Sequence, residues 1–397
     1  MAQELEDLFN SGALVRPSDQ KANLVHLVRA LAASSGVEDV PRSAPVEELT
    51  RIIGPTEHVV FVLLDGLGMN IVRRLPDDSF LRQSLMGELN ATCPSTTACA
   101  LTSVATAAYP NRHCVTGWFT HLPEFGITAM ILPFAERFSN QPLIKRGIRP
   151  EDVLPLTPVV AKMKREALTL VPAYIANTTY NVYSRAGTEG MGYESLTDGI
   201  SKVIQHVMGA EGPTYTHLYL HDIDTLCHHV GVNHDTVVPL VMGIDSELER
   251  LATALAGRAR IVVTADHGLI DVPKPDQALL LPGDAMLELL VVPPSGDARM
   301  PIFHVKEGMR EAFAMLFRER YGDRMVLLDV DDAERMELFG PGAMSPVARR
   351  RFGDFLAIPL RPATLAFHPA HKPVTDLYLA VHAGMSPEEM TVPLCVA

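Results

Sequence analysis

Three apolar runs that each end in acidic residues constrain the fold of this chain more than any other feature. Each run has the length and composition of a buried strand, and the three cover residues 59–64, 216–220 and 260–264. The first is followed by Asp65, the second by Asp222 and Asp224, and the third by Asp266. Ligands of open α/β sheets collect outside the carboxyl ends of the strands, so the pattern predicts one acidic site at one sheet edge.

Helical patterns alternate with these strands. Residues 235–256 repeat apolar side chains at helical spacing, and residues 1–50 read as a helical N-terminal segment. Because 47% of the 397 residues are hydrophobic, the chain can bury a large core. The alternation predicts an α/β fold with a mostly parallel central sheet and helices on both faces.

One stretch departs from this alternation. It is rich in Pro and Gly and contains one clear helix near residues 307–320, after which a strand-like run at 377–381 returns to the earlier pattern. We therefore expect a catalytic core of residues 51–275 and 372–397, with 276–371 as a small inserted lobe or cap. A long peripheral excursion of the same domain is the alternative.

Charge and cysteine content narrow the possible partners. The formal charge is −13 with no basic patch, which argues against a nucleic-acid polymer or an anionic membrane as partner. The five cysteines are never spaced as CxxC, and the sequence has no apolar run of the roughly 18 residues that a spanning helix needs. These features predict a cytoplasmic protein without a membrane anchor.

Carboxylates and imidazoles recur in the spacing of metal ligands. Asp224 and His228 are four residues apart, so on a helix they share one face, and His229 and His234 are nearby alternatives. The full candidate set holds three carboxylates and three imidazoles: Asp65, Asp224, His228, Asp266, His267 and His382. These ligand types suit two divalent ions, zinc or alternatively manganese. Two dications against three carboxylates leave about one positive charge, which favours an oxyanion.

A hydroxyl-rich turn precedes the helix expected at residues 100–105. Its residues are Cys93-Pro94-Ser95-Thr96-Thr97-Ala98. One interpretation is a helix N-cap, because Ser and Thr oxygens accept the free N–H groups there. The other is a nucleophile, since a metal ion activates a threonine hydroxyl that is otherwise weak at neutral pH.

The order of these motifs resembles the alkaline phosphatase superfamily, and most closely its type I phosphodiesterase/nucleotide pyrophosphatase family. The matching motifs are Asp65-Gly66, Pro94 to Thr97, Asp224-x-x-x-His228-x-x-Gly231, Asp266-His267-Gly268, and the late His382 followed by Gly384. The resemblance covers residues 57–275 and 372 to the end. It implies an alkaline-phosphatase-like three-layer sandwich and two divalent ions, most often Zn²⁺.

The resemblance also implies roles for single residues. Thr97 would be the nucleophile and form a phosphothreonine, because the hydroxyl of the family stands third after the Pro; Thr96 is its rival. One ion would be held by Asp65, Thr97, Asp266 and His267, and the other by Asp224, His228 and His382. His368 and His371 are rivals of His382.

A small-molecule phosphoric ester is the expected substrate, with diester or pyrophosphate bonds favoured because no Arg follows Thr97 closely. A phosphomonoesterase and a phosphonoacetate-type phosphonate hydrolase are alternatives within the superfamily. A non-catalytic metal-binding or scaffold protein is the alternative from another class. Trp118 and Phe119 are candidates for a pocket wall or for loop packing, and the motifs assign neither substrate-binding residues nor an oligomeric state.

Overall fold

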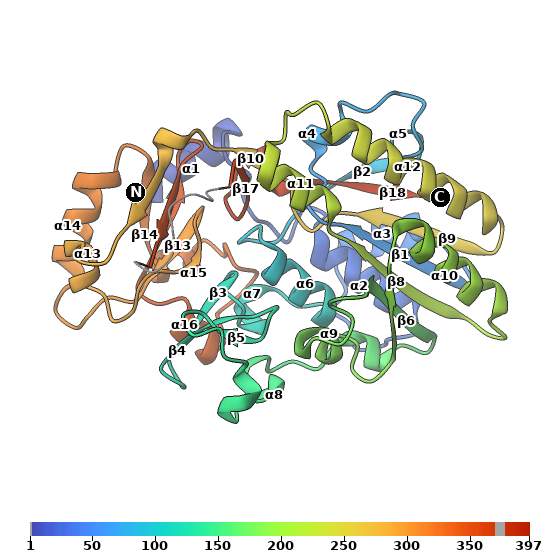
Figure 1. Ribbon diagram of the computed structural model, residues 1–397, viewed down its shortest axis with the longest axis horizontal. Coiled ribbons are helices and arrows are strands. Elements are labelled where there is room, and N and C mark those ends of the chain that lie inside the picture. Colours follow the sequence, from blue (N-terminus) through green and yellow to red (C-terminus); the bar gives the residue numbers. More distant parts are fainter. Residues whose placement is uncertain (1, 370–377) are drawn as a thin grey trace.

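The computed structural model describes residues 2–369 and 378–397 and contains two seven-stranded sheets (Figure 1). The first sheet, which we call the core sheet, has the spatial order β2 (Leu85–Asn90), β18 (Thr391–Val396), β9 (Ala259–Thr264), β1 (His58–Leu64), β8 (Thr214–Leu220), β6 (Glu166–Pro172) and β7 (Glu189–Tyr193). The three runs expected as strands are therefore the three adjacent central strands β9, β1 and β8.

The core sheet is mostly parallel, as the sequence predicts. β1 pairs in parallel with β8 and β9, β6 pairs in parallel with β7 and β8, and only β18 runs antiparallel to its neighbours β2 and β9. Every residue of β1 is buried. The unbroken apolar run of this strand is explained by its cover on both faces.

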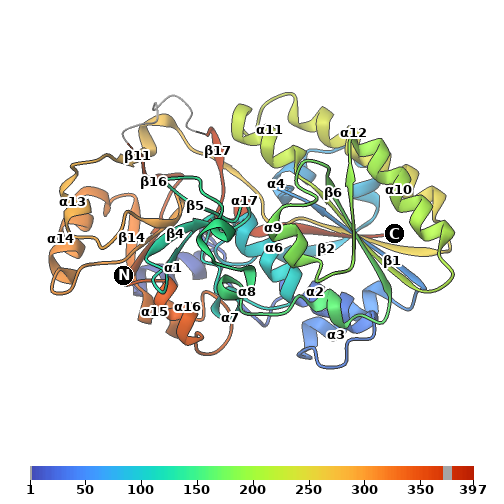
Figure 2. The same ribbon diagram turned by 60° about the horizontal axis from the view of Figure 1, so that its bottom comes forward.

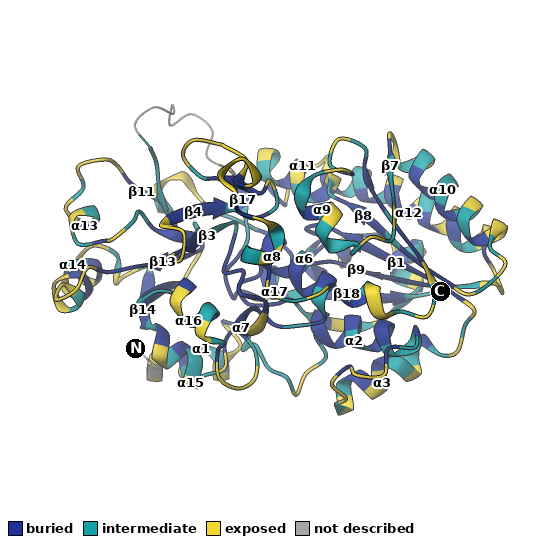
Figure 3. Cartoon of the chain, turned by 90° about the horizontal axis from the view of Figure 1, so that it is seen from below, coloured by how far each residue is buried: buried dark blue, intermediate teal, exposed yellow. Residues whose placement is uncertain are grey.

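Helices cover both faces of the core sheet (Figure 2). On one side lie α2 (Leu24–Ser34), α3 (Ala44–Ile53) and α6 (Thr97–Thr106), and on the other lie α10 (Leu196–Gly209), α11 (Asp222–Val230) and α12 (Val237–Ala254). This is the three-layer α/β arrangement expected from the sequence. The strands are largely buried and the exposed residues lie on the outer sides of the helices and loops (Figure 3).

The second sheet, the lobe sheet, is antiparallel throughout. Its order is β14 (Met325–Asp329), β15 (Phe355–Pro359), β13 (Met300–Phe303), β12 (Ser295–Asp297), β3 (Phe119–Leu122), β4 (Ile127–Met130) and β5 (Ala135–Glu136). β3 to β5 come from the predicted core, and they join the lobe strands where Phe119 pairs with Gly296. A boundary at residue 275 therefore does not separate the two sheets, because strands from both sides of it form the lobe sheet. The division into a core and an inserted lobe stays a prediction.

Two strand pairs link distant segments. They are β10 (Ile270–Asp271) with β17 (Ala380–Val381), and β11 (Gln277–Leu280) with β16 (Thr364–Phe367). The strand expected at 377–381 is thus only two residues long within the described part of the chain. Residues 371 and 372, the predicted boundary of the lobe, lie outside the described residues.

The first 50 residues contain α1, α2 and most of α3, and these helices pack against different units. Leu5 of α1 (Ala2–Ser11) belongs to a buried cluster with Met300, Phe339 and Phe352 of the lobe. Leu27 of α2 packs in the cluster of the core sheet. The first 50 residues therefore span both halves of the molecule.

The remaining helices are short, apart from α14, and connect these elements. They are α4 (Met69–Val72), α5 (Phe80–Gln83), α7 (Pro110–His113), η1 (Leu143–Arg146), α8 (Pro150–Val153), η2 (Val159–Lys162), α9 (Thr179–Ser184), η3 (Lys274–Asp276), α13 (Ala285–Glu288), α14 (Arg310–Tyr321), α15 (Val330–Arg335), α16 (Pro346–Arg351) and α17 (Pro387–Met390). α14 is the helix expected near 307–320. Among the described residues, no helix combines the length and apolar character needed to cross a bilayer.

Candidate active site

The acidic residues that follow β1, β8 and β9 lie at one edge of the core sheet, because these strands are adjacent and parallel. Leu64 at the end of β1 is level with Leu220 of β8, and Leu63 is level with Thr264 of β9. Asp65 directly follows β1, Asp266 lies two residues after the end of β9, and α11, which contains Asp224, begins shortly after β8. Parallel pairing in this register brings the three strand ends together, as the sequence predicts.

The first group of side chains lies between β1 and β9. His267 Nε2 is 3.5 Å from Asp65 Oδ1 and 3.3 Å from Asp266 Oδ2. All three side chains are buried, and their ligand atoms lie within 4.8 Å of one another. Gly268 follows His267, and a Cβ built there would lie 2.0 Å from the backbone oxygen of Glu388, so a residue with a side chain does not fit.

The second group combines α11 with the C-terminal segment. Asp224 Oδ2 is 3.2 Å from His228 Nε2, and its Oδ1 is 3.8 Å from His382 Nε2. Asp224, His267 and His382 also form a compact set of possible ligands, and the rings of His267 and His382 stack with centroids 3.8 Å apart. The structure therefore places all six predicted imidazoles and carboxylates in one continuous cluster.

The three imidazoles are oriented in the same way. The Nδ1 atoms of His228, His267 and His382 lie 2.7, 3.1 and 3.2 Å from the backbone carbonyl oxygens of Ala380, Gly268 and Ser95. A carbonyl only accepts, so each Nδ1 carries the proton and donates it. Each Nε2 then presents a lone pair toward the carboxylates, as histidine ligands of metals do.

Several carboxylate oxygens of the cluster have no hydrogen-bond donor. Asp65 Oδ1, Asp224 Oδ1 and Asp266 Oδ2 are buried and accept no hydrogen bond from the described residues. Lone pairs and unpartnered carboxylate oxygens that face one another repel unless a cation lies between them. The donor set therefore fits divalent metal ions.

The pKa values reflect the same charge imbalance. Burial raises the pKa of Asp65 well above its usual range, and repulsion by Asp266 and Asp224 adds to this effect. Burial also raises the pKa of Asp266. For Asp224, burial acts upward too, but the hydrogen bond and charge of His228 outweigh it and lower the pKa to about 2. A cation between these groups would relieve the repulsion.

Thr97 lies beside this cluster at the start of α6. Its Oγ1 is 3.1 Å from His267 Nε2. Thr96 is the N-cap residue, but neither it nor Thr97 makes a side-chain cap hydrogen bond, so the capping interpretation of these hydroxyls is wrong. The Thr96 hydroxyl is buried, accepts no hydrogen bond among the described residues, and lies on the side of Asp297, whose pKa it lowers.

The rival histidines are placed differently. His229 and His234 are exposed, and His234 Nδ1 is 2.9 Å from the Thr236 hydroxyl. His368 lines a cavity near the cluster, whereas His371 lies outside the described residues. Among the described histidines, only His228, His267 and His382 belong to the ligand cluster.

Two polar residues of the site carry no signal in the sequence. The hydroxyl of Tyr219, the next-to-last residue of β8, donates a hydrogen bond to Asp65 Oδ2. Asp297 of β12 accepts the Trp118 backbone N–H at 2.9 Å. Burial raises the pKa of Asp297 to about 6, although the hydrogen bond from the Trp118 N–H and the nearby Thr96 hydroxyl act in the opposite direction. Alternation within a strand does not mark Tyr219, and only the pairing of β12 with β3 brings Asp297 to the site.

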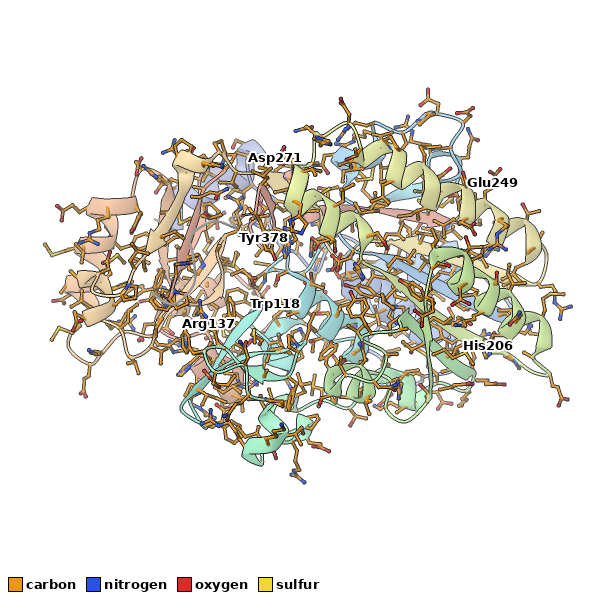
Figure 4. The ribbon with its side chains drawn as sticks, in the orientation of Figure 1. Trp118, Arg137, His206, Glu249, Asp271 and Tyr378 are labelled. Carbon is orange, nitrogen blue, oxygen red and sulfur yellow. The ribbon has the colours of Figure 1, made fainter. Side chains whose placement is uncertain are left out.

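Two cavities meet at Thr97. One, of about 430 Å³, extends beside α6 into the core, and the other, of about 540 Å³, lies between the core and lobe sheets. Trp118 lines both cavities, as the sequence suggested for a pocket wall, and it lies with Arg137 and Tyr378 between the two sheets (Figure 4). Thr97 is therefore accessible to a small molecule from two sides.

Comparisons with known proteins agree with this geometry. The sequence model of the family described as type I phosphodiesterase/nucleotide pyrophosphatase matches residues 59–292. No curated protein sequence matches significantly. Among solved structures, murine ectonucleotide pyrophosphatase/phosphodiesterase 5 is similar with a TM-score of 0.64 at 15% identity, covering 85% of this chain and 87% of that one. Phosphonoacetate hydrolase from Sinorhizobium meliloti has a TM-score of 0.63 at 16% identity, covering 86% and 90%. At these identities the structures support the fold alone.

Proposed function

The chain belongs to the type I phosphodiesterase/nucleotide pyrophosphatase family of phosphoric ester hydrolases, and we propose that it cleaves diester or pyrophosphate bonds with Thr97 as the nucleophile. The single observation that carries this proposal is the position of the Thr97 hydroxyl against His267, at the edge of the buried carboxylate cluster. Attack by the Thr97 hydroxyl on phosphorus would break one ester or anhydride P–O bond, release that substituent with a proton, and give a phosphothreonine. Water would then break the Thr97–phosphorus bond and release the remaining phosphate product.

Seven residues would hold two divalent ions, which we propose to be zinc, with manganese as the alternative. One site would consist of Asp65, Thr97, Asp266 and His267, and the other of Asp224, His228 and His382. When bound, the ions would supply positive charge that favours the ionised hydroxyl and steadies the leaving oxygen. Tyr219 and the backbone carbonyls near the site hold Asp65 and the imidazoles in place for this arrangement.

α6 supports the reaction independently of any ion. Its first N–H groups have no partner within the helix, and they face the same end of α6 as the Thr97 hydroxyl. They can donate hydrogen bonds to the phosphoryl oxygens of a bound ester. Thr97 and these donors are rigidly linked, so the helix start orients the nucleophile and its target together.

The charge of the cavities favours a diester. Among the described residues that line the two cavities, Arg137 is the only Lys or Arg. A monoester dianion requires more positive charge around its oxygens than the monoanion of a diester. We therefore place phosphomonoesters second to diesters and pyrophosphates.

A phosphonate that carries a carboxylate is the second candidate substrate. The Sinorhizobium meliloti enzyme was solved with phosphonoacetate. Arg137 lies in the larger cavity over the Phe119 ring, 3.9 Å from its centroid, and no ion pair of Arg137 is formed within the described part of the chain. Release of phosphate from phosphonoacetate, lost in Arg137→Gln, would favour this candidate.

A paired assay tests the main proposal. Wild type, Thr97→Ala and Thr96→Ala are compared on bis(4-nitrophenyl) phosphate and 4-nitrophenyl phosphate. We expect faster turnover of the diester and a loss of about a thousandfold or more in kcat for Thr97→Ala alone, because the nucleophile is removed. A fully active Thr97→Ala with an inactive Thr96→Ala would reassign the nucleophile, and turnover of the monoester alone would reject the substrate class.

The surroundings of the cysteines bear on the compartment. All five cysteines lie in the described part of the chain, where they are buried and free. Free buried thiols are typical of proteins that function in a reducing compartment. We propose a cytoplasmic location, which fractionation of cells that express the native protein would test.

A further inference from the structure

The smaller cavity at Thr97 has mainly apolar walls. It lies between α6 and one face of β6 and β8, and η2 closes its far end. The apolar side chains that line it include Leu101, Val104, Val159, Met163, Val171 and Ile175. This is the composition of a site for a hydrocarbon group rather than for a sugar or a second phosphate.

The cavity is long enough for an extended chain. It follows α6 from Thr97 to Ala105, a rise of about 12 Å at 1.5 Å per residue. The opposite wall comes from Tyr215, His217 and Tyr219, which alternate along β8 and so share one face of the sheet. Both walls belong to rigid elements, so the shape of the cavity is fixed by the fold.

Charged groups are confined to the catalytic end of this cavity. Asp65 and Asp224 are the only Asp, Glu, Lys or Arg residues among the described residues that line it. Burial lowers the pKa of His217 to about 4, so its imidazole is neutral at pH 7. The Tyr180 hydroxyl is 3.1 Å from the Thr102 hydroxyl and thus already has a partner. A charged substituent would therefore find no counter-charge here.

The larger cavity, in contrast, has charged and aromatic walls. Arg137, Asp297 and several aromatic rings line it. Both cavities open at Thr97 and Asp224. A phosphodiester has two substituents on one phosphorus, and the two cavities can accept one each. The apolar cavity then selects the substituent that carries no charge.

We propose that the cavity along α6 binds an alkyl or acyl chain, so that the substrate is a phosphodiester with one extended apolar substituent. This inference rests on the proposed function, and it names the substrate class of the same site. The buried His217 Nε2, which has no hydrogen-bond partner among the described residues, is a polar atom of this wall that is available to contact an ester or hydroxyl group on that chain.

The test is a homologous series of alkyl 4-nitrophenyl phosphate diesters, from methyl to hexyl, assayed with the metal-loaded full chain. We expect kcat/KM to rise about threefold per methylene, on the order of a hundredfold from methyl to hexyl, because each CH₂ leaves water. A kcat/KM that does not depend on chain length would overturn the proposal.

Two matched variants locate the effect. Ala105→Phe fills the far part of the cavity, and Ala254→Phe makes the same change at an exposed position of α12. We expect the hexyl-to-methyl ratio to fall at least about tenfold in Ala105→Phe and to stay unchanged in Ala254→Phe. Equal ratios in both variants would place the chain elsewhere.

Binding separates this inference from the proposed function. Calorimetry on Thr97→Ala compares hexylphosphonate with methylphosphonate, and it needs no turnover. Tighter binding of the hexyl compound, reduced when Ala105→Phe is added, supports the apolar site even if no diester is hydrolysed. Equal affinity for both compounds overturns the site even if the methyl diester is a good substrate.

Discussion

The buried carboxylate of Glu389 and the buried carboxylates of the active site are balanced in opposite ways. Glu389 pairs with Arg299 through Oε1 at 2.9 Å and Oε2 at 2.5 Å, and its oxygens also accept the N–H groups of Gly384 and Ser386. Asp65 and the other acids of the active site keep oxygens without a donor. The first set is complete within the chain, whereas the second requires something added from outside.

The two sets are neighbours in the fold. Arg299 also donates to the carbonyl oxygens of Arg361 and Ala363, so the pair fastens the lobe to the C-terminal segment that carries His382. A Cβ at Gly384 would lie 2.6 Å from Glu389 Oε2, which explains the glycine two residues after His382. The Arg299–Glu389 pair, whose charges are compensated, therefore holds the segment that carries His382 in place. Neutralising Glu389 should lower the stability of the metal-free protein, whereas neutralising an acid of the active site should raise it.

The largest expected effect is the loss of the satisfied pair. Glu389→Gln leaves the buried Arg299 guanidinium uncompensated, and we expect the free energy of unfolding to fall by about 3–5 kcal/mol. Urea unfolding measures this, with Glu388→Gln on the next residue as the control that changes little. Added divalent metal should not restore the loss, and a change below about 1 kcal/mol would show that the pair is not a scaffold.

For the active-site carboxylates that lack hydrogen-bond donors, the corresponding test is the removal of metal ions. Ions present at 100 to 1,000 times Kd stabilise the folded chain by about 3–4 kcal/mol, so a chelator should lower the urea midpoint accordingly. Re-addition of zinc or manganese should restore it. An identical midpoint with and without the chelator would mean that the cluster of Asp65, Asp224 and Asp266 holds no ion.

Asp297 is an intermediate case, with one backbone donor and a pKa raised to about 6 by burial. Its folded-state pKa lies above the unfolded value, so this contribution to stability is present below about pH 4 and is lost as the pH rises to about 6. We expect the free energy of unfolding of Asp297→Asn to be higher than that of the wild type by about 3 kcal/mol at pH 7 and to be the same at pH 4. Unfolding curves across this range, in metal-free buffer, check the crossover; a constant difference would assign the effect to packing.

The smallest expected change in stability is that of Asp266→Asn, and it is a gain where Glu389→Gln gives a loss. Asp266→Asn keeps an oxygen for the N–H groups of Gly66 and His267 but removes a repelling charge. We expect the metal-free variant to be about 1 kcal/mol more stable than metal-free wild type, and to gain less on metal addition. Destabilisation of the metal-free variant would mean that the cluster is already balanced internally.

The sequence predicts the central part of this site well, for a physical reason. Runs such as 59–64 are apolar because the strand is buried on both faces, and their carboxyl ends meet because parallel pairing aligns them. Once the strands are recognised, Asp65 and Asp266 follow. The resemblance to a known family then adds His382, which lies far along the chain from the other ligands.

The rest depends on contacts that no local pattern encodes. The two halves of the lobe sheet are joined where Phe119 pairs with Gly296, 177 residues along the chain, and that pairing brings Asp297 to Trp118. The Arg299–Glu389 pair likewise joins two distant segments. The sequence also leaves open whether the hydroxyls of residues 95–97 cap the following helix, and only the geometry of the helix start shows that the N-cap residue Thr96 makes no side-chain cap hydrogen bond.

The metal content of the purified chain tests the central claim most directly, namely that the unsatisfied acids hold two divalent ions. Inductively coupled plasma mass spectrometry on wild type and on Glu388→Gln should find two zinc or manganese ions per chain, and clearly fewer on Asp266→Asn. Diffraction at the metal absorption edge should place them at Asp65–Asp266–His267 and at Asp224–His228–His382. Less than one ion per chain, together with no recovery of ester hydrolysis on adding zinc or manganese, would contradict it.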